Sequence, residues 1–331
     1  MKQDGRSRLR ALKLGVFASS LPLAVGRRLG FFADQGLEVC VERVRSSRQQ
    51  MSALADGSYD VVQTSPDNLA AYRVNGTNPL GRRLAVTAFL AADSGMNLVL
   101  VGAPGVTDVD VVRHRVLAVD SAHSGFAFVA YALLERHGMF RDRDYTVHEV
   151  GGVAARAEHL LNGHCSLTLL SNGFELQAVR RGCTVLDEVG SVARPYLGTV
   201  FSCLSAWLEQ HPDIATAFTV AYLDAVAWSL DPAHREQAVE LLASELGVTS
   251  QVAAGLYSPY VDPRHGLVAD GMVGQAALRS VLDLRARYGG FDTSEGPVDL
   301  DLLSRPGILY DLTTSVRAHR KRSSRSVTTT R

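Results

Sequence analysis

Short apolar segments alternate with amphipathic segments along the first ninety residues of the chain. Apolar runs of this length are typical of buried strands, and apolar residues spaced three and four apart are typical of helices. We therefore expect strands at 12–17, 37–44, 59–64, 83–91 and 96–102, and helices at 21–35, 45–57 and 65–76. Strands separated by helices predict right-handed βαβ units and a largely parallel sheet.

The same alternation restarts near residue 93 and continues to about residue 190. Here we expect strands at 116–120, 145–150, 166–170 and 184–190, and helices at 121–138, 152–163 and 171–182. Beyond residue 200 the pattern becomes helical, with periodic segments at 213–231, 233–247, 250–261 and 270–290. Two α/β units followed by helices predict an α/β protein with two lobes.

Composition narrows the function classes. Lys plus Arg and Asp plus Glu number 34 each in 331 residues, so no net field favours nucleic acid or an anionic membrane. No apolar span is long enough to predict membrane insertion. Cys40, Cys165, Cys183 and Cys203 show neither a CxxC pair nor metal-ligand spacing, so we expect free thiols and no metal site.

Several segments together resemble a known fold. GFFADQGLEV (30–39) and SALADGSYDVVQTSPDNLAAY (52–72) carry the resemblance in the first unit, and VLAVDSAHSGFAFVAYALLERHG (116–138) carries it in the second. The chain is similar to the type II periplasmic binding proteins, specifically the NMT1/THI5-like group that binds sulfonates, taurine and nitrate. Pyrimidine-precursor synthases are a nearby branch of the same group.

The resemblance implies a hinge-linked, two-lobed fold with the C-terminal helices on lobe one. Lobe one would comprise 11–90 and 197–315, and lobe two would comprise 91–196. The hinge would lie near 91–94 and 194–198, and the ligand would bind between the lobes. The basic segment 316–331 is low in apolar residues, and we expect it to be disordered.

Small polar residues occupy the strand-to-helix turns of both units. Helix N-termini present free N–H groups and partial positive charge, so they favour an anion, and an arginine can clamp one. Taken singly, each serine is better explained as an ordinary N-cap, and only their concentration at one sheet edge predicts a site. The predicted ligand-binding residues are Ser19, Ser20, Arg45, Ser46, Arg48, Ser65, Asp67, Ser121, His123, Ser124, Gly125, Asn172 and Tyr196.

We interpret the chain as a solute-binding protein that captures a small organic anion, such as a sulfonate or carboxylate, for an ABC transporter. No cofactor is expected, the protein partner would be an ABC permease, and the protein would be a monomer. The alternative is a cytoplasmic enzyme on the same fold, a cofactor-independent decarboxylase- or desulfinase-like lyase or a biosynthetic enzyme, with His123 as proton donor. A metabolite sensor without chemistry is a third possibility.

Two features bear on this choice. Related enzymes that use pyridoxal phosphate need a lysine, but Lys13 lies at the base of the first strand, and Lys2 and Lys321 lie in the tails. Where the desulfinase relatives place a cysteine, this chain has Ser19 and Ser20. The first seventeen residues lack the apolar run of a signal peptide, which predicts a cytoplasmic protein as written, or an extracytoplasmic one if the start is truncated.

Overall fold

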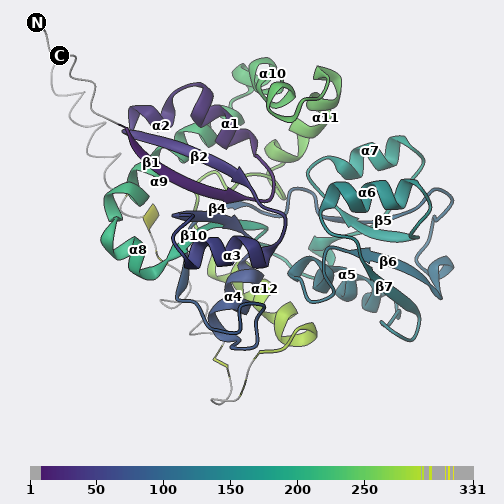
Figure 1. Cartoon of the computed structure of the whole chain (residues 1–331). Coiled ribbons are helices and arrows are strands. Elements are labelled where there is room, and N and C mark those ends of the chain that lie inside the picture. Colours follow the sequence, from purple (N-terminus) through teal and green to yellow (C-terminus); the bar gives the residue numbers. More distant parts are fainter. Residues whose placement is uncertain are drawn as a thin grey trace, which may run out of the picture.

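The computed structural model describes residues 9–291, together with 293, 298, 299, 310, 312, 313 and 316. Its strands form two five-stranded sheets flanked by helices, which confirms the predicted α/β class (Figure 1). The segment 317–331, most of the predicted disordered tail, lies outside the described residues.

The first sheet has the order β2-β1-β3-β10-β4. Its strands are β1 (Arg10–Val16), β2 (Leu37–Arg43), β3 (Val61–Thr64), β4 (Val86–Asp93) and β10 (Thr199–Leu204). Strand β1 pairs in parallel with β2 and β3, whereas β10 is antiparallel to both β3 and β4. The expected parallel sheet is therefore interrupted by one reversed strand, because the chain leaves after β4 and returns through β10 from the opposite direction.

The second sheet has the order β7-β6-β8-β5-β9. Its strands are β5 (Val99–Gly102), β6 (Arg115–Val119), β7 (Tyr145–Glu149), β8 (Leu167–Leu170) and β9 (Thr184–Glu188). Strand β6 pairs in parallel with β7 and β8, and β5 is antiparallel to β8 and β9. The chain thus passes from one sheet to the other twice, between β4 and β5 and between β9 and β10.

Helices cover both sheets (Figure 1). Around the first sheet they are α1 (Leu21–Arg28), α2 (Phe31–Asp34), α3 (Ser47–Ala55) and α4 (Pro66–Val74), and around the second they are α5 (Gly125–Arg136), α6 (Val153–Leu161) and α7 (Phe174–Arg180). Short 3-10 turns occur at Asp110–Val112, Val189–Ser191 and Pro232–His234. The prediction of a single helix at 21–35 is wrong, because Gly30 adopts a left-handed φ of 85° and divides this segment into α1 and α2.

The C-terminal helices are α8 (Ser205–Gln210), α9 (Pro212–Leu230), α10 (Arg235–Leu246), α11 (Ser250–Val261) and α12 (Gln275–Tyr288). Helix α9 fills the core of the first sheet, where Phe218 packs against Phe32, Phe89 and Phe201. Helix α12 packs against both α4 and α5, and its Leu278 and Leu282 share one apolar cluster with Phe128. One C-terminal helix therefore contacts both halves of the molecule.

Candidate ligand-binding site

The turn between β1 and α1 holds the two serines that the sequence singles out. Ser20 is the N-cap of α1, yet its hydroxyl makes no capping bond, and it is covered without a hydrogen-bond partner among the described residues. The first amide of the helix, Leu21 N–H, donates to the Tyr260 hydroxyl. Ser19 Oγ instead donates to Glu245 Oε1 of α10 at 2.6 Å. Of the two hydroxyls, the one of Ser20 is left for a ligand.

Next to this turn, a chain of polar side chains connects β3 with the two connections between the sheets. Gln63 Nε2 donates to Thr199 Oγ1 at 3.0 Å, and the Thr199 hydroxyl donates to Asp93. Asp93 also accepts from Gly95 N at 2.9 Å. Burial raises the pKa of Asp93 to about 6, and the bonds from Thr199 and Gly95 oppose that shift.

The charge of Asp93 acts on three tyrosines, Tyr196, Tyr222 and Tyr260. Burial raises the pKa of Tyr222 and of Tyr260, the latter to about 12, and the charge of Asp93 adds to both shifts. The Tyr222 hydroxyl is fully covered and has no partner in the described part of the chain. Tyr196, predicted at the hinge, is buried, and burial followed by the charges of Asp67, Asp93 and Asp120 raises its pKa. The Tyr196 ring lies against Gly95 in the connection between β4 and β5, where an added Cβ would be 3.1 Å from Tyr196 Cδ1.

A buried ion pair lies at a second contact between the two halves of the molecule. Asp67 of α4 accepts from Arg285 Nε and Nη2 of α12 at 2.6 and 2.8 Å, and also from Gly125 N–H of α5. Burial raises the pKa of Asp67, and the Arg285 guanidinium opposes this effect. A Cβ on Gly125 would lie 2.5 Å from that of Asp67. Both predicted ligand contacts, Asp67 and Gly125, are therefore satisfied within the chain, and we omit them from the proposed site.

The remaining turn serines divide into two kinds. Ser46, Ser65 and Ser124 accept from the third following amide and cap α3, α4 and α5, as the N-cap interpretation expects. Ser124 also donates to Asp120 Oδ1 at 2.5 Å. Ser121 lies on the second-sheet side and bonds Glu149 Oε1 at 3.2 Å.

His123 and Asn172 belong to the second-sheet side as well. The His123 side chain is exposed, and its backbone oxygen accepts from Arg285 Nη2 at 3.2 Å. No hydrogen bond holds the His123 ring within residues 9–291. Asn172 is exposed, adopts a left-handed φ of 58° and donates to Ser171 Oγ at 3.0 Å.

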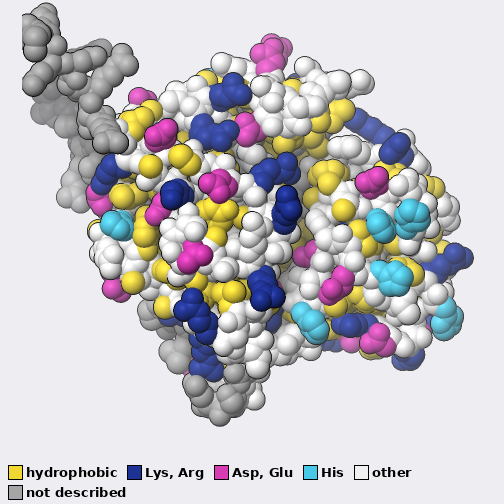
Figure 2. Space-filling view, viewed as in Figure 1, with side chains coloured by type: hydrophobic (Ala, Val, Ile, Leu, Met, Phe, Trp, Pro, Cys, Tyr) yellow, Lys and Arg dark blue, Asp and Glu magenta, His cyan; other side chains and the backbone are white. Residues whose placement is uncertain are grey.

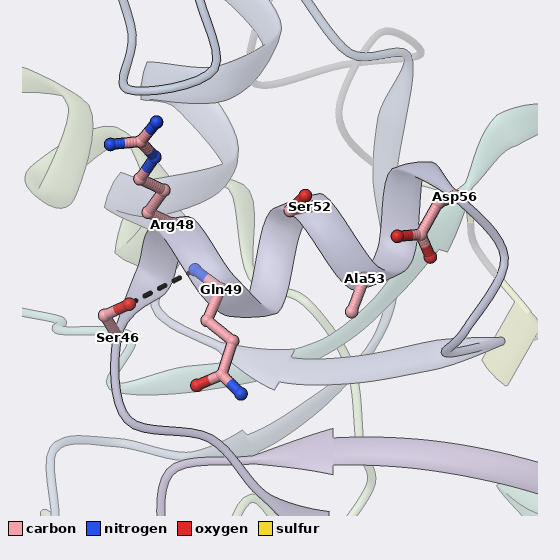
Figure 3. Close-up of a pocket in the computed structure, with 6 residues that line it drawn as sticks. All are labelled: Ser46, Arg48, Gln49, Ser52, Ala53 and Asp56. Carbon is pink, nitrogen blue, oxygen red and sulfur yellow. Dashed lines mark hydrogen bonds between the residues drawn. The ribbon is translucent and has the colours of Figure 1, made fainter.

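Positive charge gathers beside the site. Figure 2 shows a groove between the two halves of the molecule with Lys and Arg side chains along one side. Arg45 and Arg48 are both exposed at the start of α3. A separate hollow of about 420 Å³ follows the outer side of α3 (Figure 3) and is lined by Ser46, Arg48, Gln49, Ser52, Ala53 and Asp56. Because it draws on no residue of the second sheet and includes a carboxylate, we do not take this hollow as the anion site.

Three residue groups were missed from the sequence. Gln63, Asp93 with Thr199, and Arg285 contact partners up to 218 positions away, which no local pattern reveals. A signal does exist for two of them. Gln63 interrupts the apolar strand VVQT, and Asp93 ends the fully buried strand VTAFLAAD. A polar residue in such a strand needs a specific partner.

Within the described residues, no group of three or more His, Cys, Asp or Glu side chains is arranged to hold a metal ion. The four cysteines are free, and only Cys40 is exposed. None of the helices in the described ranges combines the length and apolar character needed to cross a membrane.

This two-lobed arrangement is the type II periplasmic-binding-protein fold. The chain belongs to the NMT1-like family, whose model matches residues 5–243. It is similar to the bicarbonate transport ATP-binding protein CmpC of Synechocystis sp., with 25% identity over 249 residues. That match covers 70% of this chain but only 36% of the relative.

Solved structures share the fold over nearly the whole chain. The periplasmic nitrate-binding protein NrtA from Synechocystis PCC 6803 has a TM-score of 0.79 at 14% identity, covering 94% of this chain and 89% of that one. The periplasmic aliphatic sulphonate binding protein SsuA from Escherichia coli has a TM-score of 0.68 at 16% identity, covering 91% and 94%. The desulfurization enzyme DSZB has a TM-score of 0.64 at 13% identity, covering 94% and 99%.

Proposed function

We propose that this protein is a solute-binding protein that captures a small organic or inorganic anion between its two lobes. The observation that carries the proposal is the Ser20 hydroxyl, a covered donor without a partner at the N-cap of α1, where a helix N-terminus favours an anion. Membership of the NMT1-like family and the likeness to nitrate- and sulphonate-binding proteins support the choice.

The proposed contacts come from both sides of the groove. Ser20 and Tyr196 would contribute from the first sheet and the hinge, and His123 and Asn172 from the second sheet. Ser121 is left out because its hydroxyl donates to Glu149. Arg45 and Arg48 would attract the anion from the rim. We propose lobe boundaries at 11–90 with 197–315 and at 91–196, so that closure about 91–94 and 194–198 encloses the ligand.

The partner that fits this role is an ABC permease, and a protein serving it would work outside the cytoplasmic membrane as a monomer. The relative CmpC is a bicarbonate transport ATP-binding protein, and this supports a transport setting. Pull-down of the tagged protein with co-expressed candidate permeases tests the partnership, and sedimentation equilibrium tests the monomer.

The ligand is tested by calorimetry with nitrate, bicarbonate, taurine and propane-1-sulfonate. We expect at least one of these anions to bind, and Ser20→Ala to weaken that binding about tenfold through loss of one hydrogen bond. Ser52→Ala, on the exposed side of α3, is the matched control and should bind as the unaltered protein does. Full affinity in Ser20→Ala would contradict the proposed site.

The enzyme alternative has one observation in its favour, the fold shared with the desulfurization enzyme DSZB. A general acid must be oriented toward its substrate, however, and the exposed His123 ring has no orienting partner in the described part of the chain. Incubating the bound anion with the protein and following it by mass spectrometry separates the two functions. Turnover that disappears in His123→Ala would establish the enzyme.

A further inference from the structure

The hydrogen-bond chain from Gln63 through Thr199 to Asp93 has one possible direction while Asp93 is ionised. An ionised Asp93 accepts from both Thr199 Oγ1 and Gly95 N–H and has no hydrogen to give. The single hydroxyl hydrogen of Thr199 is thereby committed to Asp93. Thr199 Oγ1 must therefore act as the acceptor for Gln63, and only the amide nitrogen of Gln63 can donate to it.

This direction determines which end of the Gln63 amide is left over. With Nε2 bonded to Thr199 at 3.0 Å, Oε1 is turned away from that contact, and it is covered without a partner among the described residues. The backbone of Gln63 is held separately, because its carbonyl accepts from Gln50 Nε2 at 3.0 Å. Gln50 Nε2 also donates to Gly15 O at 3.0 Å, which ties the end of β3 to β1.

A covered acceptor without a donor is unfavourable, because its lost hydrogen bonds to water are not replaced. Gln63 pairs with Val16 of β1, the strand that leads into the Ser20 turn. Anion sites normally offer donors, so a leftover acceptor beside this strand would select among anions. We propose that Gln63 Oε1 is a ligand subsite that accepts a hydrogen bond from an N–H or O–H group of the bound anion. This inference rests on the proposed function and names the ligand class, a small anion that also carries a donor.

The ligand class divides familiar anions into matched pairs. Bicarbonate carries an O–H and nitrate does not, although both are planar monoanions of similar size. Likewise 2-hydroxyethanesulfonate carries an O–H where propane-1-sulfonate has a methyl group. Sites that hydrogen-bond a substrate hydroxyl discriminate strongly against an analogue that lacks it, because the site's own polar group is then left unpaired.

Protonation of Asp93 would reverse the chain. A protonated Asp93 can donate to Thr199 Oγ1, which frees the Thr199 hydrogen for Gln63 Oε1 and turns Nε2 toward the ligand. The titratable groups on which the charge of Asp93 acts are Tyr196, Tyr222 and Tyr260, and all three are neutral below pH 8 because their pKa values are raised. His265 lies on the segment whose Leu267 pairs with Asp93. Preference for a donor-bearing anion should therefore weaken as the pH falls below about 6, where Asp93 takes up its proton.

The first experiment measures calorimetric affinity for both anion pairs at pH 8. We expect the donor-bearing member to bind about tenfold more tightly, as one well-formed hydrogen bond gives. In Gln63→Met the ratio should fall to about twofold or less, while Gln49→Met, an exposed glutamine on α3, should keep it. Equal binding of both members by the unaltered protein overturns the inference, even if it supports the proposed function.

The second experiment needs no ligand and tests the direction of the chain. Gln63→Glu places a carboxylate where a donor is required, so Thr199 cannot satisfy both acids. We expect the melting temperature of Gln63→Glu to lie below that of Gln63→Met at pH 8. At pH 5 this difference should disappear, because one of the two neighbouring carboxyl groups is then protonated and can donate a hydrogen bond. A Gln63→Glu variant as stable as the unaltered protein at pH 8 overturns the inference. If no anion binds, the proposed function fails and the subsite with it, whatever the direction of the chain.

Discussion

At the scale of single residues, the ion pair between Asp67 and Arg285 ties α4 to the start of α5 through α12. The side chains of Arg285 and Asp67 are 6% and 1% exposed, and Arg285 also lies over the Phe128 ring at 5.2 Å. Removing the cation leaves a buried carboxylate without a counter-charge. We expect Arg285→Met to lower the free energy of unfolding by about 3–5 kcal/mol, measured by urea denaturation.

A matched control lies on the same helix. Arg279 bonds Asp283 at 2.9 Å across the exposed side of α12, with 42% and 56% of the side chains exposed. Exposed pairs of this kind contribute little, so Arg279→Met should cost about 1 kcal/mol or less. Similar losses in the two variants would show that the buried pair does not hold the halves together.

A second residue-scale prediction concerns Gly198, in the returning connection. A Cβ there would lie 2.0 Å from Asp93 Oδ1 and 2.5 Å from Gly95 N, and the Gly198 amide donates to Asp93 O at 2.9 Å. Overpacking this contact requires the two connections to move apart. Gly198→Ala should therefore lower the free energy of unfolding by about 1–3 kcal/mol in urea. Unchanged stability would mean that the two connections can move apart at Gly198 without a cost in free energy.

At the scale of elements, Gly255→Ala in α11 is the counterpart of Gly198→Ala, because here a glycine has room for an added methyl group. Gly255 lies inside a twelve-residue helix, and the nearest atom to an added Cβ is Arg180 Nη2 at 3.5 Å, an ordinary contact. Alanine restricts the unfolded chain and favours the helix, so we expect a gain of about 0.5–1 kcal/mol in the same denaturation measurement. A loss would indicate that Arg180 needs the space.

The elements also show how far the sequence can be interpreted alone. The sequence predicts β1 to β9 because short apolar or alternating segments recur between helical segments and turn residues. Strand β10, TVFSCL, was missed because it runs directly into α8 without a turn signal. The residues in the strand-to-helix turns were predictable from the sequence, whereas the hydrogen-bonded group Gln63, Thr199 and Asp93 was not. These three residues come together only through the order of strands in the sheet.

At the scale of the whole molecule, Asp93 makes stability depend on pH through the connection between the sheets. Burial raises its folded-state pKa to about 6, above the value of about 3.8 in the unfolded chain, so the folded state binds more protons between these values. Stability from this group is thus fully present below about pH 4 and is lost as the pH rises through about 6. The full loss is about 3 kcal/mol.

Asparagine at this position cannot ionise, which isolates the contribution of Asp93 from those of the other carboxylates. We expect the difference in free energy of unfolding, Asp93→Asn minus the unaltered protein, to rise between pH 4 and pH 6 and to stay constant from pH 7 to pH 9. Urea denaturation across this range measures it. A difference that is flat throughout would mean that Asp93 ionises without penalty. The hydrogen-bond chain to Gln63 would then lose its pH dependence near 6, although its direction at pH 8 would stand.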